Sequence, residues 1–233
     1  MRVLIIPGFW LPAVSFAPLV SALARDGFDA RALSLPGVSS RSDDRRHVTW
    51  AEHVAAVVSE VDGRDDDVVL VGHSAGGALA HACADARPHR VRRVVYVDAI
   101  PPVNGECVNA SLSSVDGEIP LPDWTEFPAG DLVDMSDDLL AQLRAGAIPV
   151  PAHVATDPVV LRDPRRHRVP ITIIACGFTR RDVESWIGDA DPAAAELAAM
   201  EDVTYVELST GHWPHLSRPL ELALALREIL RSS

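Results

Sequence analysis

Lysine is absent from this chain of 233 residues, so its 21 strongly basic side chains are all arginines. Without a lysine amine, catalysis through a Schiff base or a lysine general base is excluded. Cysteine is scarce as well, since Cys83, Cys107 and Cys176 lie far apart and form no C-x-x-C pair. We therefore expect buried free thiols, and neither a disulfide framework nor a zinc site.

Long apolar runs and an excess of positive charge are missing too. No apolar run approaches the roughly 20 residues of a membrane span. The net charge of −12 disfavours nucleic acids and anionic membranes as partners. The first residues enter a predicted strand without the longer apolar region and cleavage site of a signal peptide, so a cytoplasmic location is expected. Hydrophobic residues make up 48% of the chain, which is enough for the large core of one globular domain.

The chain is organised around residues 68–77, which read VVLVGHSAGG. The four apolar residues predict a short strand buried on both faces, and an alanine-rich helical run follows. Between them, Gly72 to Gly76 fit the pattern G-x-S-x-G, in which a sharp turn from strand to helix exposes the serine hydroxyl. Ser74 is therefore the candidate nucleophile, and the N–H of Ala75 at the helix start is a candidate donor to an oxyanion. The alternative is a glycine- and serine-rich turn without a chemical role.

Strands and helices alternate along most of the chain, which predicts an α/β fold with a mainly parallel sheet flanked by helices. We expect strands at 2–6, 28–35, 68–71, 94–97, 171–176 and 203–208. The expected helices are 14–26, 49–61, the alanine-rich run after residue 77, 192–200, and a closing helix that Ser217 caps and that has Pro219 near its first turn.

A segment without a convincing strand interrupts this alternation at residues 104–168, where prolines and acids are frequent. Two short helices are expected in it, at 132–143 and 154–161. Its length inside a β/α series predicts a small inserted cap on a single domain, 1–233. Four aromatic residues are candidates for an apolar pocket lining, although ordinary packing is their more common role: Trp10, Trp124, Phe127 and Trp213.

Functional side chains in a parallel sheet lie at the carboxyl ends of the strands. His212 follows the expected strand 203–208 by four residues, in a glycine-containing loop before the closing helix, and is the candidate general base. His215 is the nearest rival, but it falls where that helix starts. His73 precedes the candidate nucleophile and is expected to pack against or orient the turn. The remaining histidines are expected on the surface: His47, His53, His81, His89, His153 and His167.

The order of these motifs resembles the α/β-hydrolase superfamily: PGFW after the first strand, GHSAGG, a cap, and GHW before the last helix. Within it, the chain is most similar to the small-substrate branch that includes plant methyl esterases and hydroxynitrile lyases. The resemblance covers nearly all of the chain outside 104–168, and implies the order nucleophile, acid, histidine. It also implies a second oxyanion donor at the N–H of Phe9. The family's His-Gly is Pro7-Gly8 here, but a backbone donor needs no histidine side chain.

The acid of the implied triad has two candidates. The slot that the family usually uses, shortly after strand 171–176, holds no acid, and Asp182 follows that slot by three residues. Asp98 follows strand 94–97, and some α/β-hydrolases take their acid from that strand end. Four apolar residues precede Asp98, so its carboxylate should be partly buried and should need a partner such as a histidine N–H. Two arginines beside Asp182 favour an exposed ion-pair role for it, so Asp98 is preferred.

These residues predict a serine hydrolase in which Ser74, His212 and Asp98 cleave a carboxylester, lactone or thioester of a small, largely apolar substrate. A serine in the turn excludes haloalkane dehalogenases and epoxide hydrolases, which use aspartate, and Trp213 stands where the resembling hydroxynitrile lyases carry lysine. The alternatives are a catalytically weak small-ligand receptor, and an accessory hydrolase or cyclase of secondary metabolism. A small molecule is the expected partner. No nucleic acid, membrane, cofactor or metal is expected, and a homodimer is left open.

Overall fold

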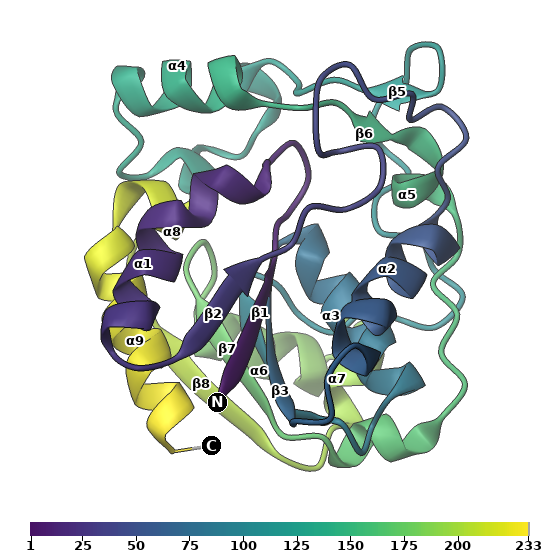
Figure 1. The fold of residues 1–233 in the computed structure, drawn as a ribbon, viewed down its shortest axis with the longest axis vertical. Coiled ribbons are helices and arrows are strands. Elements are labelled where there is room, and N and C mark those ends of the chain that lie inside the picture. The colour runs from purple at the N-terminus through teal and green to yellow at the C-terminus, as the bar shows by residue number, and fades with distance from the viewer. Residues whose placement is uncertain (233) are drawn as a thin grey trace.

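The computed structural model describes residues 1–232 and is built on a sheet of six parallel strands in the order β2-β1-β3-β4-β7-β8 (Figure 1). This confirms the predicted fold class, the α/β-hydrolase fold with a parallel central sheet flanked by helices. The second strand is shorter than predicted, the third ends two residues later, the fourth begins three residues earlier, and the last two each end one residue earlier. The strands are β1 (Arg2–Ile6), β2 (Asp29–Ala32), β3 (Val68–His73), β4 (Val91–Val97), β7 (Ile171–Ala175) and β8 (Val203–Glu207).

Helices cover both faces of the sheet (Figure 1). One face carries α1 (Ala17–Arg25), α8 (Pro214–Ser217) and α9 (Pro219–Arg231), with η1 (Ala13–Phe16) before α1. The other face carries α2 (Trp50–Asp62), α3 (Ala75–Ala86), α6 (Arg180–Gly188) and α7 (Ala195–Ala198), with η5 (Pro192–Ala194) before α7.

The central strands are apolar throughout because both of their faces are buried. All five residues of β1 are buried. Val3 and Ile5 belong to the core that includes Leu226 of α9, whereas Leu4 and Ile6 belong to the core that includes Val57 of α2. Side chains of a strand alternate between its two faces, so one apolar run serves two cores.

The chain between β4 and β7, residues 98–170, is called the cap segment below. Its central part lies across the carboxyl ends of the strands, at the top of Figure 1. Its β5 and β6 pair in antiparallel fashion, a small sheet that the sequence did not predict. The elements are β5 (Glu118–Ile119), η2 (Trp124–Glu126), η3 (Ala129–Leu132), α4 (Asp137–Gly146), β6 (Val150–Pro151), α5 (Ala152–Thr156) and η4 (Pro164–Arg168).

Capping explains why the cap helices differ from the expected 132–143 and 154–161. Helix α4 begins at Asp137 because the hydroxyl of Ser136 accepts a hydrogen bond from the N–H of Leu139, with an N···O distance of 3.3 Å. Helix α5 ends at Thr156, since Asp157 precedes a proline and adopts an extended conformation.

Two features near the end of the chain correct the sequence analysis. Helix α6 was not predicted, and it includes Asp182, the second candidate for the acid. The closing helix is divided into α8 and α9, and Ser217 does not cap α9. The Ser217 hydroxyl instead lies 2.9 Å from the Thr210 hydroxyl and 3.2 Å from the carbonyl oxygen of Trp213, to which it donates.

Two histidines that were expected on the surface are buried, because polar partners meet them inside the fold. His53 in α2 lies with its Nε2 2.8 Å from the carbonyl oxygen of Pro36. His81 in α3 lies with Nδ1 2.7 Å from the Tyr96 hydroxyl and Nε2 3.0 Å from a carboxylate oxygen of Glu196. The α3 helix is thereby tied to β4 and α7 behind the G-x-S-x-G turn.

The three cysteines are unpaired, as predicted, but only Cys83 is buried, whereas Cys107 and Cys176 are partly exposed. Over residues 1–232, no helix combines the length and the apolar character that crossing a bilayer requires.

Candidate active site

The predicted strand, sharp turn and helix around Ser74 are present. Strand β3 ends at His73 and α3 begins at Ala75, so Ser74 alone forms the corner. Its φ of 52° and ψ of −127° are unusual for a residue with a side chain and mark a strained backbone. The N–H of Ser74 donates to the carbonyl oxygen of Val97 at 3.0 Å, and its own carbonyl oxygen accepts from the N–H of Gly77 at 2.8 Å. These bonds hold the corner in place.

Two glycines allow the chain to pass close to this corner. A Cβ atom on Gly76 would lie 2.1 Å from the carbonyl oxygen of Ile6, and one on Gly72 would lie 2.5 Å from the carbonyl oxygen of Gly76. Neither separation is possible for real atoms, so both positions require glycine. The loop after β1 is equally close, because a Cβ on Gly8 would lie 2.9 Å from the Cβ of Ser74.

His212 and Asp98 are joined by a hydrogen bond, although 114 positions separate them. Nδ1 of His212 lies 2.6 Å from Oδ2 of Asp98, and the other oxygen of Asp98 accepts the N–H groups of Cys176 and Gly177 at 3.0 and 2.7 Å. Burial alone raises the pKa of Asp98, but the bonds and charge from His212 and the two backbone bonds outweigh it, so that the pKa is lowered. The Asp98 carboxylate is therefore held in its charged form.

The backbone of the His212 loop is fixed from two sides. The cap segment supplies one, because the N–H groups of Gly211 and His212 donate to the carbonyl oxygens of Val133 and Asp131 at 3.2 and 2.8 Å. The turn supplies the other, because Nε2 of His73 lies 2.6 Å from the carbonyl oxygen of His212. His73 thus contacts the loop that carries His212, whereas the sequence suggested only that it packs against or orients the turn.

A cleft of about 1050 Å³ is lined by Ser74, Asp98 and His212 together with Phe9 and Ala75. The structure therefore brings all five residues singled out by the sequence to one cavity at the carboxyl end of the sheet. Among the four aromatic candidates for its lining, two belong to it, Trp10 and Phe127. The other two, Trp124 and Trp213, do not line it and pack edge to face against each other, with 6.0 Å between their ring centres.

The remaining candidates lie outside this cleft. Asp182 is exposed in the first turn of α6, where its carboxylate accepts the N–H and hydroxyl of Thr179 at 2.8 and 2.7 Å in a capping box. His215 is buried and stacks on Phe16 with 4.1 Å between the ring centres.

Sequence reasoning singled out only Asp98 among the acidic residues of the cleft, and it missed Asp131 in the cap segment, which is partly buried there. Burial raises the pKa of its carboxyl, the charge of His212 opposes this effect, and the charge of Asp98 adds to it. Acidic residues are frequent throughout the cap segment, so the sequence held no signal that distinguishes this one. Within residues 1–232, no group of three or more histidine, cysteine or acidic side chains is placed to hold a metal ion.

Known proteins resemble this chain in sequence and in fold. The chain is 28% identical to "Probable hydrolase R7" of a Phoma species over 251 aligned positions, which cover 97% of each protein. Among solved structures, an extracellular alpha/beta-hydrolase from a Paenibacillus species matches with a TM-score of 0.75 and 20% identity over 98% of both chains. A methylesterase, MES16 from Arabidopsis, matches with a TM-score of 0.72 and 16% identity over 100% of both chains. The family model described as "Alpha/beta hydrolase family" matches residues 3–226. The chain therefore belongs to the alpha/beta hydrolase family, and it is an enzyme.

Proposed function

We propose that the protein is a serine hydrolase that cleaves an ester-type bond of a small, largely apolar molecule, namely a carboxylester, a lactone or a thioester. One observation carries the proposal: Ser74, at a strained corner, lines the same cleft as a histidine whose Nδ1 is bonded to a buried carboxylate. A serine hydroxyl becomes an effective nucleophile when a histidine removes its proton and an acid orients that histidine.

In the proposed reaction, the Ser74 oxygen attacks the carbonyl carbon while Nε2 of His212 takes the hydroxyl proton. Asp98 keeps the proton of His212 on Nδ1 and stabilises the imidazolium that forms. The protonated histidine then gives its proton to the leaving alcohol or thiol, which leaves an acyl group on Ser74. A water molecule, deprotonated by His212, releases the acid and restores the serine.

The N–H groups of Phe9 and Ala75 are the proposed donors to the carbonyl oxygen as it gains negative charge. Ala75 is the first residue of α3, where an N–H has no acceptor within the helix. The close approach of Gly8 to Ser74 supports the assignment of Phe9, because it puts the following amide beside the nucleophile. Loss of one such donor typically lowers the rate by about 10²- to 10³-fold.

The lining of the cleft supports an apolar substrate. Phe9, Trp10, Ile100, Leu112 and Phe127 all contribute to it, and apolar and aromatic side chains form most of the wall in typical small-molecule sites. The names of the compared proteins, a hydrolase and a methylesterase, agree with ester chemistry. The cytoplasmic location and the homodimer considered from the sequence stay predictions.

Covalent labelling by a fluorophosphonate tests the proposal. We expect one phosphonyl group per chain, located at Ser74 by mass spectrometry, and no label on the Ser74→Ala variant. Hydrolysis of p-nitrophenyl esters of graded chain length should be lost in the same variant. An unlabelled Ser74 in a folded protein that binds small esters tightly without turnover would instead identify a small-ligand receptor.

A further inference from the structure

We infer that the cleft at Ser74 selects its substrates by charge, and that Asp131 sets this selectivity beside His212. Esters with a neutral or ammonium-bearing acyl group are accepted, and those with a carboxylate or phosphate in the cleft are rejected. The inference rests on the proposed function and names the substrate class of the same site. It also favours neutral esters and lactones over thioesters of phosphate-bearing carriers.

The charged side chains that line the cleft share one sign. Within the described part of the chain, every Asp, Glu or Arg side chain in that lining is a carboxylate, and these are Asp98, Glu106, Glu126, Asp131 and Asp191. A cleft with walls of one charge and low dielectric focuses the field and concentrates ligands of the opposite charge. Three of the five are exposed at the rim, whereas Asp98 and Asp131 lie deeper.

Asp131 differs from Asp98 because its charge is not compensated. Asp98 is bonded to His212 and to two backbone N–H groups. Among residues 1–232, the half-buried carboxylate of Asp131 has no hydrogen-bond or salt-bridge partner. The two carboxylates border the same small space, since a Cβ atom on Gly177 would lie 3.3 Å from Oδ2 of Asp98 and 3.5 Å from Oδ1 of Asp131. A positive group of a substrate therefore finds an available partner next to His212.

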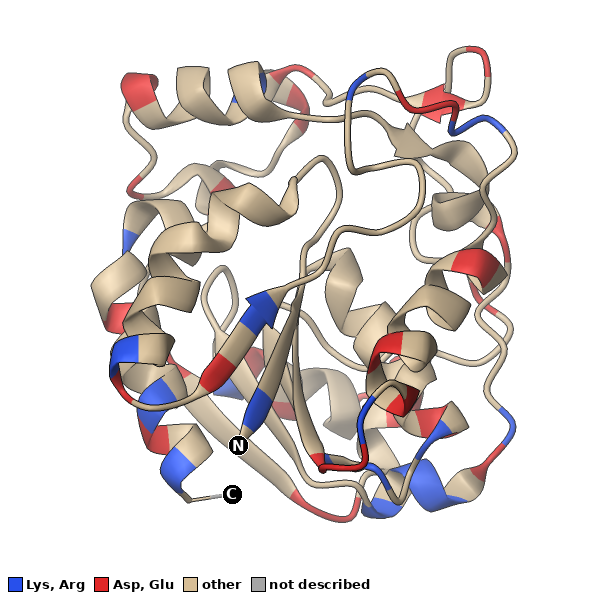
Figure 2. Ribbon diagram, viewed as in Figure 1, with Lys and Arg blue, Asp and Glu red and all other residues tan. Residues whose placement is uncertain are grey.

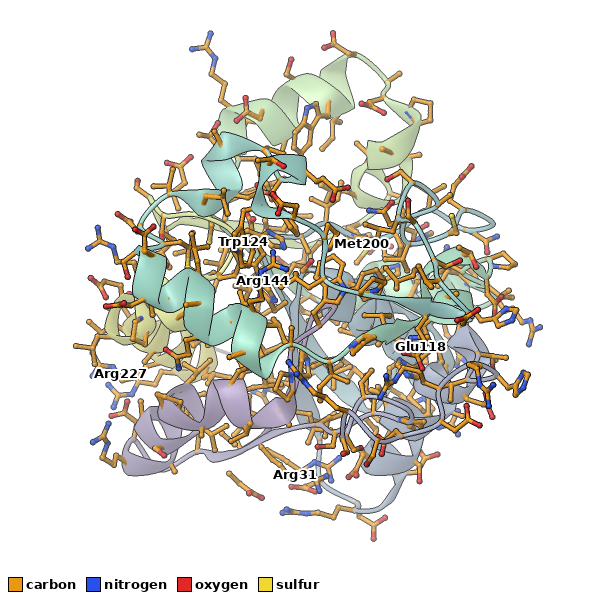
Figure 3. The ribbon with its side chains drawn as sticks, turned by 90° about the horizontal axis from the view of Figure 1, so that it is seen from above. Arg31, Glu118, Trp124, Arg144, Met200 and Arg227 are labelled. Atoms are coloured by element: carbon orange, nitrogen blue, oxygen red, sulfur yellow. The ribbon has the colours of Figure 1, made fainter. Side chains whose placement is uncertain are left out.

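Within the described part of the chain, no arginine lines the cleft, and several arginines around the cap segment are bound to other groups, so they do not offset this charge. Arg144 lies over the ring of Trp124, 4.6 Å from its centre, and donates to the carbonyl oxygen of Pro122 at 2.8 Å. Figure 3 shows Trp124 and Arg144 side by side. Three others pair with carboxylates at 2.6 to 3.0 Å, namely Arg45 with Glu118, Arg166 with Glu196 and Arg218 with Asp134. Many further basic segments lie along the lower part of the molecule in Figure 2, away from the cap.

Three p-nitrophenyl esters of matched size provide the test. The acyl groups are 5,5-dimethylhexanoyl, which is neutral, 4-(trimethylammonio)butanoyl, which is cationic, and the glutaryl half-ester, which is anionic. Each value of kcat/KM is divided by the rate of alkaline hydrolysis of the same ester, which removes differences in intrinsic reactivity. At low ionic strength we expect the cationic ester to exceed the neutral one, and the neutral one the anionic one, by roughly tenfold per step. Added salt should reduce both ratios.

Asp131→Asn should bring both ratios towards one, because the amide keeps the shape and the backbone carbonyl but removes the charge. Asp137→Asn is the matched control. It removes the same charge from an exposed residue in the first turn of α4 that does not line the cleft, and it should leave the ratios unchanged. Unequal loss of thermal stability in the two variants is checked by melting curves.

The failures of the two proposals are distinguishable. Hydrolysis of the neutral ester with equal or greater turnover of the anionic ester overturns the charge selectivity and leaves the serine hydrolase in place. If no ester is hydrolysed and Ser74 takes no label, the proposed function falls. The charge selectivity is then decided by calorimetric binding of the three matching p-nitroanilides to Ser74→Ala. Binding in the order cationic, neutral, anionic supports it, and any other order, or no binding at all, overturns it.

Discussion

Nε2 of His73 lies 2.6 Å from the backbone carbonyl oxygen of His212, a residue 139 positions away. Because a carbonyl oxygen only accepts, His73 carries its proton on Nε2. Burial and the nearby charge of His212 lower the pKa of His73 to about 3, so the ring is neutral at physiological pH. The residue before the proposed nucleophile thereby holds the loop of the proposed base.

His73→Phe should lower kcat by roughly 10- to 100-fold, since small displacements of a catalytic group cost about this much. KM should change less, because His73 does not line the cleft. His73→Gln offers an N–H at a similar reach and should recover part of kcat. Steady-state kinetics over pH 5 to 9 measures this. A uniform fall in the amount of folded protein, with kcat per folded molecule unchanged, would show that His73 only packs.

Asp98→Asn and Asp182→Asn separate the two acids that the sequence proposed. The amide of asparagine at position 98 can donate an N–H to Nδ1 of His212, which favours the tautomer with its proton on Nε2. That nitrogen then cannot accept the serine proton, so kcat should fall by about 10⁴-fold, as is typical of such triads. Asparagine at position 182 weakens only the capping box of α6, so kcat should stay close to that of the unaltered protein. Hydrolysis of a neutral p-nitrophenyl ester measures both. The reverse result would move the acid to α6.

Glu196→Gln tests the buried cluster of His81, Arg166 and Glu196 behind the G-x-S-x-G turn. Burial raises the pKa of Glu196, but hydrogen bonds from His81 and Arg166 outweigh it and lower the pKa from 4.5 to about 2. A lowered pKa stabilises the fold at pH above 4.5, and this contribution disappears as pH falls towards 2. The melting temperature of the variant should therefore be lower by roughly 6–20 °C at pH 7, because the variant breaks the buried ion pair with Arg166. Near pH 2.5 the decrease should be much smaller.

Glu201→Gln is the control for this measurement, because Glu201 pairs with Arg168 at 3.5 Å on the open surface. Its melting temperature should hardly change at either pH. An equal loss for Glu196→Gln at both pH values would show that the charge of Glu196 does not stabilise the fold.

Gly76→Ala should prevent folding, because the new Cβ would lie 2.1 Å from a backbone oxygen of β1. Gly146→Ala, at the end of α4, meets nothing within 4 Å and should be neutral or stabilising by up to about 1 kcal/mol. Soluble yield and urea unfolding distinguish the two. A stable, native Gly76→Ala protein would contradict the close approach of β1 to the turn.

The fold was predictable where periodicity and local chemistry are strong. The apolar runs of β1, β3 and β7 stand out because strands buried on both faces contain few polar residues. Helix α6 was missed because charged residues outnumber apolar ones at its start, although Thr179 and Asp182 have the spacing of a capping box. The burial of His53 and His81 depends on partners supplied by distant segments, and no local pattern reports them.

The site was predictable in part for the same reason. Ser74 and His212 stand in recognisable local contexts at strand ends, and the preference for Asp98 followed from four apolar neighbours. The contact between Asp131 and His212 joins segments 81 positions apart through backbone atoms. A contact between backbone atoms does not depend on which side chains are present, so the sequence could not predict this part of the site.

The two hydrogen bonds from Gly211 and His212 to the carbonyls of Val133 and Asp131 have a consequence for protein engineering. Exchanging the cap segment for that of a relative, in order to accept other substrates, would also release the loop that carries the imidazole. A graft that leaves residues 131–133 in place keeps both hydrogen bonds. A graft that replaces these residues must supply two carbonyl oxygens in the same positions.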